Sequence, residues 1–302
     1  MPTESWPIGD VTITKVVESE NWVPLELLGE MLLPKSSRAE IEAMQWLAPH
    51  YVRDGQLSFG IYSFLVETPN RKLVVDTAVG NAKPRAGPNF NMLDAAYLDN
   101  FRDVWEPDDV DGVVSTHLHV DHVGWNTHLV DGYWLPTFTN ATYHFVEQEY
   151  RHWKRYADNN DSVNPMFDAA VVFSDSVRPV VDAGLASFVE PSAHLTPEVA
   201  LIPSHGHTPG HVSVLIESKG ESAVITGDLM HTPCQIGRPD WRVPTTQIRR
   251  PRQLPDRPSW NASRTPRRWS SARISAHRAV ATCTATARPS GLRLRASHTL
   301  GS

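Results

Sequence analysis

The apolar positions of the first 246 residues fall into short runs, and few stretches have helical spacing. These runs either alternate with polar residues or are continuously apolar, which is typical of half-buried and fully buried strands. They lie at 11–19, 59–68, 71–80, 110–119, 198–207, 211–218 and 222–230. Proline and asparagine at 69–70 and the segment SKGES at 218–222 predict hairpin turns.

Three other stretches predict helices. Residues 36–50 begin with Ser37 three residues before Glu40, a capping-box pattern, and end before a proline. Residues 93–105 have an amphipathic helical period, and residues 141–153 read as a strand that passes into a helix. Strands dominate both halves and helices lie between and after them. The pattern therefore predicts an α+β fold of two packed sheets flanked by helices, rather than a doubly wound parallel sheet.

The chain changes character after residue 246. Residues 247–302 contain twelve arginines, one aspartate, five prolines and no lysine, glutamate, tyrosine or phenylalanine, and they show no sustained helical or strand period. The first 246 residues carry 16 basic and 33 acidic side chains, so the net charge of -6 hides an acidic part and a basic part. We therefore divide the chain into a domain at 1–246 and an Arg-rich tail at 247–302 of doubtful order.

Three interpretations of this tail compete. A nucleic-acid-binding tail explains the charge, but such tails usually include lysine and have no need of Trp260 and Trp269. A disordered linker explains the prolines. A translation-frame error explains the abrupt loss of patterning, and we favour it because the chain should still be completing its core there.

Composition narrows the class of protein. The chain has 302 residues, of which 40% are hydrophobic and 21% charged, as in an ordinary soluble globular protein. No stretch approaches the roughly 20 apolar residues that span a bilayer, and no secretory signal is visible at the start. The two cysteines, Cys234 and Cys283, form no disulfide framework. We therefore expect a cytoplasmic enzyme without a membrane partner.

The chemistry is concentrated in the segment THLHVDH at 116–122. At the end of a strand, His117 and His119 point to the same side because they are two residues apart. Asp121 and His122 follow at once, where a turn can bring them to the same place. Imidazole and carboxylate groups suit zinc, manganese, iron or cobalt, so the cluster predicts a metal site.

The segment His-x-His-x-Asp-His resembles the first metal motif of the metallo-β-lactamase superfamily. GHTPGH at 206–211 is similar to the motif that supplies the next histidine, and TGDLMH at 226–231 to the motif with a metal-bridging aspartate. VVDTAVG at 74–80 resembles an early turn of the family. The resemblance covers about 10–246 and implies a four-layer αββα sandwich with metals at one edge of the sheets.

The resemblance also implies a ligand set for two divalent ions, with zinc the first expectation and manganese, iron or cobalt the alternatives. One ion would be held by His117, His119 and His207. The other would be held by Asp121, His122 and a last histidine, for which His277 is the candidate. Asp228 would be shared, and Asp76 would support the site. A hydroxide bridging two dications is then the expected nucleophile.

Three further residues near these motifs have roles that the sequence leaves open. His231 lies three residues after Asp228 and could orient substrate or support a ligand, so we count it with Asp121 and Asp228 as a candidate catalytic residue. His211 is expected to begin the next strand and to pack or form hydrogen bonds there. Trp125 could line the substrate pocket or belong to the core.

The leading functional hypothesis is a dinuclear metallohydrolase for a small ester, lactone or organophosphate-like substrate. The resemblance is to the branch with methyl parathion hydrolase and acyl-homoserine lactonases. An iron-dependent oxidoreductase on the same fold, or a product impaired by its C-terminus, are the alternatives. A nucleic-acid substrate is not expected. The apolar segments 21–34 and 133–138 could form a substrate lid or a homodimer surface.

Overall fold

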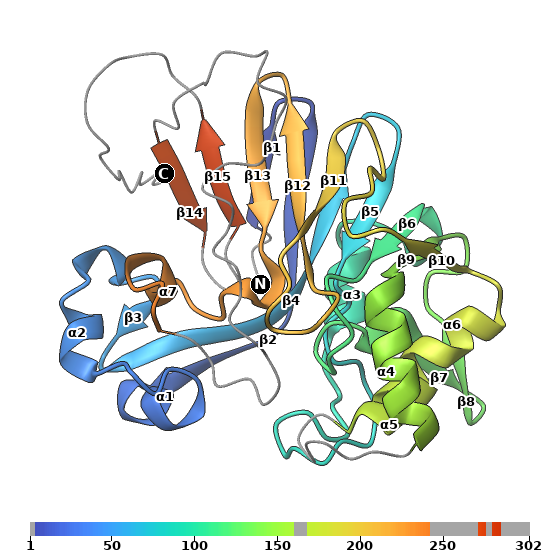
Figure 1. The fold of residues 1–302 in the computed structure, drawn as a ribbon, viewed down its shortest axis with the longest axis horizontal. Helices are drawn as coiled ribbons and strands as arrows, with labels where there is room; N and C mark the ends of the chain where they lie inside the picture. The colour runs from blue at the N-terminus through green and yellow to red at the C-terminus, as the bar shows by residue number, and fades with distance from the viewer. Residues whose placement is uncertain (1–3, 160–167, 242–270, 276–279, 285–302) are drawn as a thin grey trace.

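Two β-sheets pack face to face in the computed structural model, which describes residues 4–159, 168–241, 271–275 and 280–284 (Figure 1). The first sheet has the order β1-β2-β4-β5-β6-β9-β10, with β3 beside β4. Its strands are β1 (Glu4–Ile8), β2 (Val11–Pro24), β3 (Val52–Arg53), β4 (Gln56–Glu67), β5 (Lys72–Val75), β6 (Gly112–Val114), β9 (Thr142–Val146) and β10 (Ala186–Val189). Pairing is antiparallel from β1 to β5 and parallel from β5 to β10.

The second sheet is antiparallel throughout, with the order β11-β12-β13-β15-β14. Its strands are β11 (Val199–Pro203), β12 (Val212–Ser218), β13 (Glu221–Ile225), β14 (Ser271–Ser275) and β15 (Val280–Thr284). β14 and β15 lie in the tail, where the sequence shows no strand period. Backbone groups along the edge of β13 can pair with any extended chain, so these strands form without a strong side-chain pattern. A separate hairpin joins β7 (Thr127–Val130) to β8 (Tyr133–Pro136).

The helices lie mainly beside the first sheet. They are α1 (Leu25–Met31), α2 (Arg38–Glu42), α3 (Tyr97–Arg102), α4 (Glu147–Asn159), α5 (Ala169–Val172), α6 (Arg178–Asp182) and α7 (Cys234–Gly237). A π-helical turn at Phe173–Val177 connects α5 to α6. Within the described part of the chain, no helix is both long and apolar enough to cross a membrane.

The helix predictions are right in place and partly wrong in length. Ser37 caps α2 as expected: its Oγ accepts the Glu40 N–H at 3.3 Å and donates to Glu40 Oε2 at 2.8 Å. The helix predicted over 36–50 nevertheless ends after Glu42, and a 3-10 turn at Gln45–Leu47 follows. The helix predicted over 93–105 begins only at Tyr97. Tertiary packing overrides the helical period at these ends.

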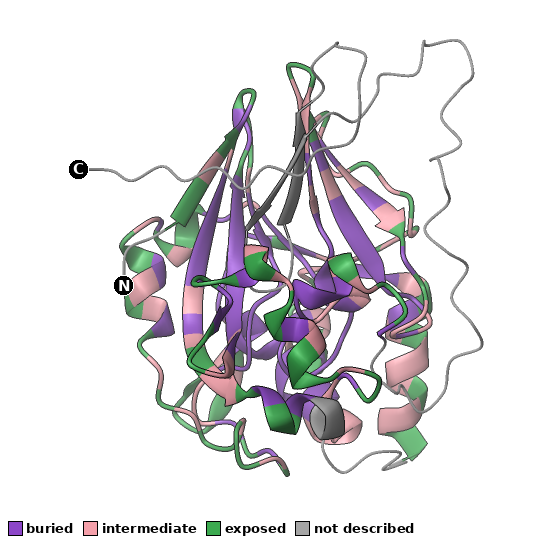
Figure 2. Cartoon of the chain, turned by 90° about the vertical axis from the view of Figure 1, so that its left-hand side faces the viewer, coloured by how far each residue is buried: buried purple, intermediate pink, exposed green. Residues whose placement is uncertain are grey.

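Three apolar clusters hold the layers together, and Figure 2 shows buried residues along the strands of both sheets. One cluster fills the space between the sheets, with Ile13, Val66 and Val75 on one side and Val214 and Ile225 on the other. A second cluster joins the first sheet to α3 and to the α5–α6 segment, and a third joins α1, α2 and α7. The predicted α+β class, with two packed sheets and flanking helices, is confirmed.

Trp125 belongs to the core rather than to a pocket wall. Its side chain is buried and stacks on Tyr97 at 5.3 Å between ring centroids. Its Nε1–H donates to Glu18 Oε1 at 2.7 Å. The two apolar segments of uncertain role differ, because Leu25 and Leu28 of α1 are buried whereas Tyr133 of β8 is 72% exposed.

The loops at one end of the two sheets are held by close backbone packing. β5 ends in a turn at which Asp76 has a φ of +56°, and this turn packs against Gly124. A Cβ placed on Gly124 would lie 1.8 Å from the carbonyl oxygen of Val79, so only glycine fits there.

Replacing this glycine should therefore destabilise the fold. We expect Gly124→Ala to lower the free energy of unfolding by at least about 2 kcal/mol, because the new methyl group displaces backbone. Gly132→Ala is the control: Gly132 has a φ of +84° but open space around the new atom, so it should cost only about 1 kcal/mol of strain. Urea unfolding followed by tryptophan fluorescence measures both, and equal losses would contradict the packing argument.

Candidate metal centre

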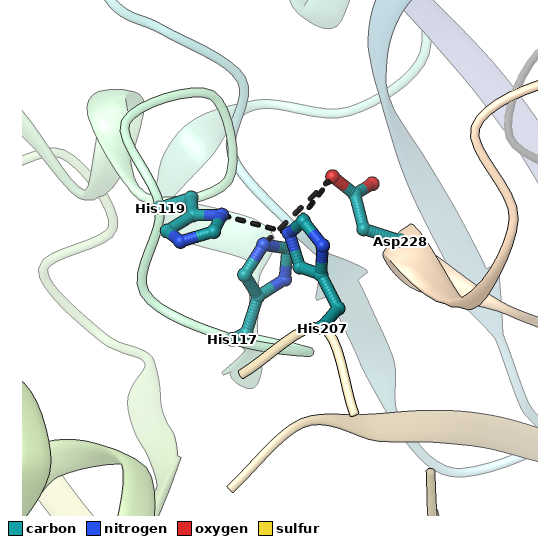
Figure 3. Close-up of side chains that lie close together, drawn as sticks. All are labelled: His117, His119, His207 and Asp228. Carbon is teal, nitrogen blue, oxygen red and sulfur yellow. Dashed lines mark hydrogen bonds and ion pairs between the residues drawn. The ribbon is translucent and has the colours of Figure 1, made fainter. Parts of the chain in front are cut away.

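Three loops at the end of the sheets bring the predicted ligands together. His117 and His119 lie in the loop after β6, His207 in the loop between β11 and β12, and Asp228 in the turn after β13. In Figure 3 these four side chains point toward one another from three separate segments. Their ligand atoms all lie within 4.8 Å of one another, and three of the four residues are buried.

The distances within this first donor group are short. His207 Nε2 lies 2.8 Å from His119 Nδ1 and 3.4 Å from Asp228 Oδ2. His117 Nε2 lies 3.9 Å from the same carboxylate oxygen. Three imidazole nitrogens and one carboxylate oxygen therefore surround one small space.

A second donor group shares Asp228 with the first. Asp121, His122 and Asp228 offer ligand atoms that again lie within 4.8 Å of one another. His122 Nε2 is 3.3 Å from Asp228 Oδ1 and 3.7 Å from Asp121 Oδ1. The two oxygens of Asp228 thus face different groups, Oδ2 toward His117 and His207 and Oδ1 toward His122.

Asp76 and Thr116 fix how two of the histidines present their nitrogens. Asp76 accepts the backbone N–H of Thr116 at 2.7 Å and its hydroxyl at 2.9 Å. Asp76 Oδ2 also accepts Nδ1–H of His122 at 2.7 Å. Thr116 Oγ1, whose proton goes to Asp76, accepts Nδ1–H of His117 at 3.1 Å. Both histidines are left with an unprotonated Nε2 directed at Asp228.

His211 is buried behind the site and holds the turn that carries Asp228. Its Nε2 accepts the backbone N–H of Asp228 at 3.0 Å, so its Nδ1–H donates to Ser204 Oγ at 2.8 Å. Ser204 and Ser213 hydroxyls lie 3.0 Å apart, and Ser213 Oγ–H reaches the carbonyl of Thr226 at 3.1 Å. The chain of hydrogen bonds starts at Asp228 and returns two residues before it. The expected hydrogen-bonding role of His211 agrees with this geometry.

Burial keeps these histidines neutral. It lowers the pKa of His119 to about 3, because the buried imidazolium loses its solvation. The pKa values of His117 and His207 fall well below their ordinary value, first through burial and then through neighbouring imidazoles. Neutral imidazole is the form that binds metal ions.

The remaining predicted residues are placed as follows. His231 Nε2 lies 3.2 Å from Asp228 Oδ2, and the His231 ring is 5.0 Å from that of His207, so His231 borders the first donor group. His277 lies outside the described residues. Cys234 is buried in the cluster that joins α1, α2 and α7 and belongs to neither donor group.

The donor set fits a metal ion better than it fits an ordinary polar core. His117 Nε2 is buried and has no hydrogen-bond partner among the described residues, although a buried polar atom normally has one. Its lone pair points toward the imidazoles of His119 and His207 and the carboxylate of Asp228, which are the ligand types of zinc and related divalent ions.

The family follows from sequence and geometry together. The family model of the metallo-beta-lactamase superfamily matches residues 58–267, more than half of the chain. The chain belongs to this superfamily, as its motifs predict.

Curated relatives are about a quarter identical to this chain over the residues that align. An N-acyl homoserine lactonase of Bacillus thuringiensis is 24% identical over 185 residues, covering 56% of this chain and 63% of the relative. Another, from a Bacillus species, is 25% identical over 190 residues, covering 58% and 66%. The chain thus spans less than two thirds of the length of these relatives.

Solved structures share the fold. A hydrolase of the beta lactamase superfamily, AbOPH, superimposes with a TM-score of 0.62 at 22% identity, covering 80% of this chain and 79% of that chain. The dizinc quorum-quenching lactonase AidC gives a TM-score of 0.60 at 18% identity, with the same coverage. These likenesses confirm the metallo-β-lactamase fold.

Some supporting residues carry no signal in the sequence. Thr116, Ser204 and Ser213 are common hydroxyl residues, and nothing in the sequence indicates that they bond to Asp76, His211 and Thr226. Glu149 is a buried acid on α4 whose oxygens accept backbone N–H groups of two site loops. Nothing in the sequence separates it from Glu147 two residues earlier, which is exposed enough to pair with Arg151.

The depressed histidine pKa values predict a pH effect on the metal-free protein. Below pH 6.5, His119 binds a proton in the unfolded chain but stays neutral in the folded site. Its contribution to the free energy of unfolding is therefore complete above pH 6.5 and is lost as the pH falls toward its folded pKa of about 3. Between pH 7.5 and 5, the protonation of His119 in the unfolded chain should lower the free energy of unfolding by about 2 kcal/mol. Urea unfolding after chelation measures this, and a flat profile would contradict it.

Removing the His211 hydrogen bonds should destabilise the protein strongly. His211→Phe leaves the Asp228 N–H and the Ser204 hydroxyl buried without these partners, so we expect a loss of about 2–5 kcal/mol. His144→Phe is the matched control, because His144 Nδ1 has no hydrogen-bond partner among the described residues and burial also lowers its pKa. Unfolding midpoints compare the two, and similar losses would refute a special role for His211.

Proposed function

We propose that this chain is a hydrolase that uses two divalent metal ions, with zinc the first expectation, on a small ester, lactone or organophosphate-like molecule. The observation that carries the proposal is the placement of Asp228. Its Oδ2 faces His117 and His207, and its Oδ1 faces His122, so the residue belongs to both donor groups. A carboxylate shared in this way suits a pair of cations that lie close together.

The residues divide into two ligand sets. His117, His119, His207 and Asp228 would hold one ion, and Asp121, His122 and Asp228 the other. Bound there, divalent ions supply a nucleophile at neutral pH by lowering the pKa of water to about 7, and they polarise the oxygen of a carbonyl or phosphoryl group. The carboxylates of Asp121 and Asp228 offset part of the positive charge.

Residues around these ligands orient the histidines and border the first donor group. Asp76 and Thr116 keep Nε2 of His117 and His122 unprotonated and directed inward. His231 borders the first donor group with its Nε2 near Asp228, and in our proposal it contacts the substrate oxygen or supports that aspartate. Its backbone N–H donates to Gln235 Oε1 at 2.6 Å, which fixes its position.

The substrate class is supported by the relatives. The curated relatives are named as N-acyl homoserine lactonases, and one solved structure of the same fold is a dizinc lactonase. Lactones, esters and phosphotriesters share a reaction in which an oxygen nucleophile attacks a polarised centre. The proposed partner is therefore a small molecule.

An activity screen with metal analysis tests the proposal. We expect purified protein to contain zinc and to hydrolyse an N-acyl homoserine lactone, a chromogenic ester or a phosphotriester. Activity should disappear after chelation and return on addition of zinc. Tightly bound iron together with oxygen consumption, and no hydrolysis, would instead favour an oxidoreductase.

Two variants test the shared role of Asp228. Asp228→Ala should abolish tight binding of both ions, because this carboxylate belongs to both donor groups. His122→Ala should weaken only the second ion. We expect kcat/KM to fall by more than about 100-fold in Asp228→Ala, beyond the effect of residues that merely support ligands.

Zinc per chain, measured by elemental analysis, and titration against a chromophoric chelator distinguish the two variants. Asp99→Asn, at an exposed carboxylate on α3, is the control and should keep the parent values. If Asp228→Ala still binds two zinc ions, the shared-ligand assignment is wrong.

A further inference from the structure

One buried carboxylate connects the two loops that carry the histidines. Glu149 lies in the first turn of α4 and is 1% exposed. Its Oε1 accepts the backbone N–H of Leu118 at 3.3 Å, and its Oε2 accepts the backbone N–H of Gly210 at 2.7 Å. Leu118 stands between His117 and His119, and Gly210 follows His207 by three residues. The side chain thus reaches both loops from outside the donor groups.

The approach of the second loop to α4 is unusually close. A Cβ placed on Gly210 would lie 2.5 Å from the backbone nitrogen of Glu149 and 2.6 Å from its Cβ. Any larger residue would therefore push the loop away from the helix. Gly210, the second glycine of GHTPGH, permits this close approach, and the hydrogen bond from its N–H to Glu149 maintains it.

A third donor fixes the carboxylate itself. Trp153, one turn later on α4, donates its Nε1–H to Glu149 Oε1 at 2.6 Å. The Trp153 ring also lies 5.2 Å from the ring of His119. Glu149 therefore has little freedom, and a buried carboxylate with N–H donors on both oxygens is a strong tether.

We propose that Glu149 is a positioning residue, which ties the His119 loop to the His207 loop and so sets the spacing of the imidazoles that receive the first metal ion. The proposal rests on the metal-binding function proposed above. It does not place Glu149 among the metal ligands or in contact with substrate. Its effect passes through two backbone N–H groups.

The change Glu149→Gln tests this with little change in volume. An amide has one acceptor oxygen and one NH₂ group, so one of the two loop N–H groups must face a donor instead of an acceptor. We expect the affinity for zinc, measured by competition with a chromophoric chelator, to fall by about 10-fold to 100-fold. KM should change less than kcat, since substrate contacts remain.

Controls separate positioning from general stability. Glu147→Gln removes a carboxylate from the same helix turn but only an exposed pair with Arg151, and it should keep the parent affinity. Val110→Ala opens a cavity in the core cluster at the far end of β6. It should lower the unfolding midpoint without weakening zinc binding. If Glu149→Gln behaves like Val110→Ala, the role is structural only and the proposal is overturned.

A second readout needs no metal. In the metal-free protein, at least one of the amide protons of Leu118 and Gly210 should exchange about tenfold faster in Glu149→Gln than in the parent, because that N–H group then faces the NH₂ group of glutamine instead of an acceptor. If the parent binds no zinc, the proposed function fails, and exchange still decides whether Glu149 joins the loops. Unchanged exchange at both amides would overturn the tether.

Should Glu149→Gln fail to fold, Glu149→Asp takes its place. Aspartate keeps the charge but is one methylene shorter, so it cannot reach both N–H groups at once. We expect zinc affinity to fall by about tenfold, with faster exchange at one of the two amides. Parent affinity with parent exchange at both amides would contradict the proposal.

Discussion

The structure depends on the close packing of four imidazoles and two aspartates, which form two donor groups where the two sheets end. Burial lowers the pKa values of His117, His119 and His207 far enough to keep them neutral, and His117 Nε2 is buried without a partner among the described residues. Such a cluster destabilises a protein unless something satisfies its lone pairs. A bound cation satisfies several of these lone pairs together, so the cluster fits a metal centre better than a polar core.

Backbone N–H groups provide much of the order around the centre. Asp76 accepts the N–H of Thr116, Glu149 those of Leu118 and Gly210, and Glu18 those of Val79 and Gly80. Each of these acids comes from one element and holds a loop of another. Because a buried carboxylate needs donors as much as the loop needs acceptors, each pair fixes both partners. Acidic residues outside the two donor groups therefore hold the loops that carry the ligands in place.

The sequence predicts the candidate metal ligands better than it predicts the residues that hold the ligand loops. His117, His119, Asp121 and His122 are close in the chain, so local pattern predicts that they meet, whereas the segments around His207 and Asp228 are joined to them only by their resemblance to motifs of the metallo-β-lactamase superfamily. Glu149 is different, because its value comes only from where α4 packs. Fold prediction divides in the same way. Alternation and turn residues place most strands, but the end of α2 and the late start of α3 depend on tertiary contacts that no local period contains.

The two donor groups are not equivalent, and the geometry explains how they differ. The described residues offer three imidazoles and a carboxylate to the first group but one imidazole and two carboxylates to the second. The first is tied through Glu149 to α4, while the second relies on Asp76 to orient His122. In the proposed arrangement, the larger number of donors would favour tighter binding of an ion at the first group. In the proposed two-ion arrangement, the first donor group would hold Asp228 through Oδ2 and leave its Oδ1 toward His122.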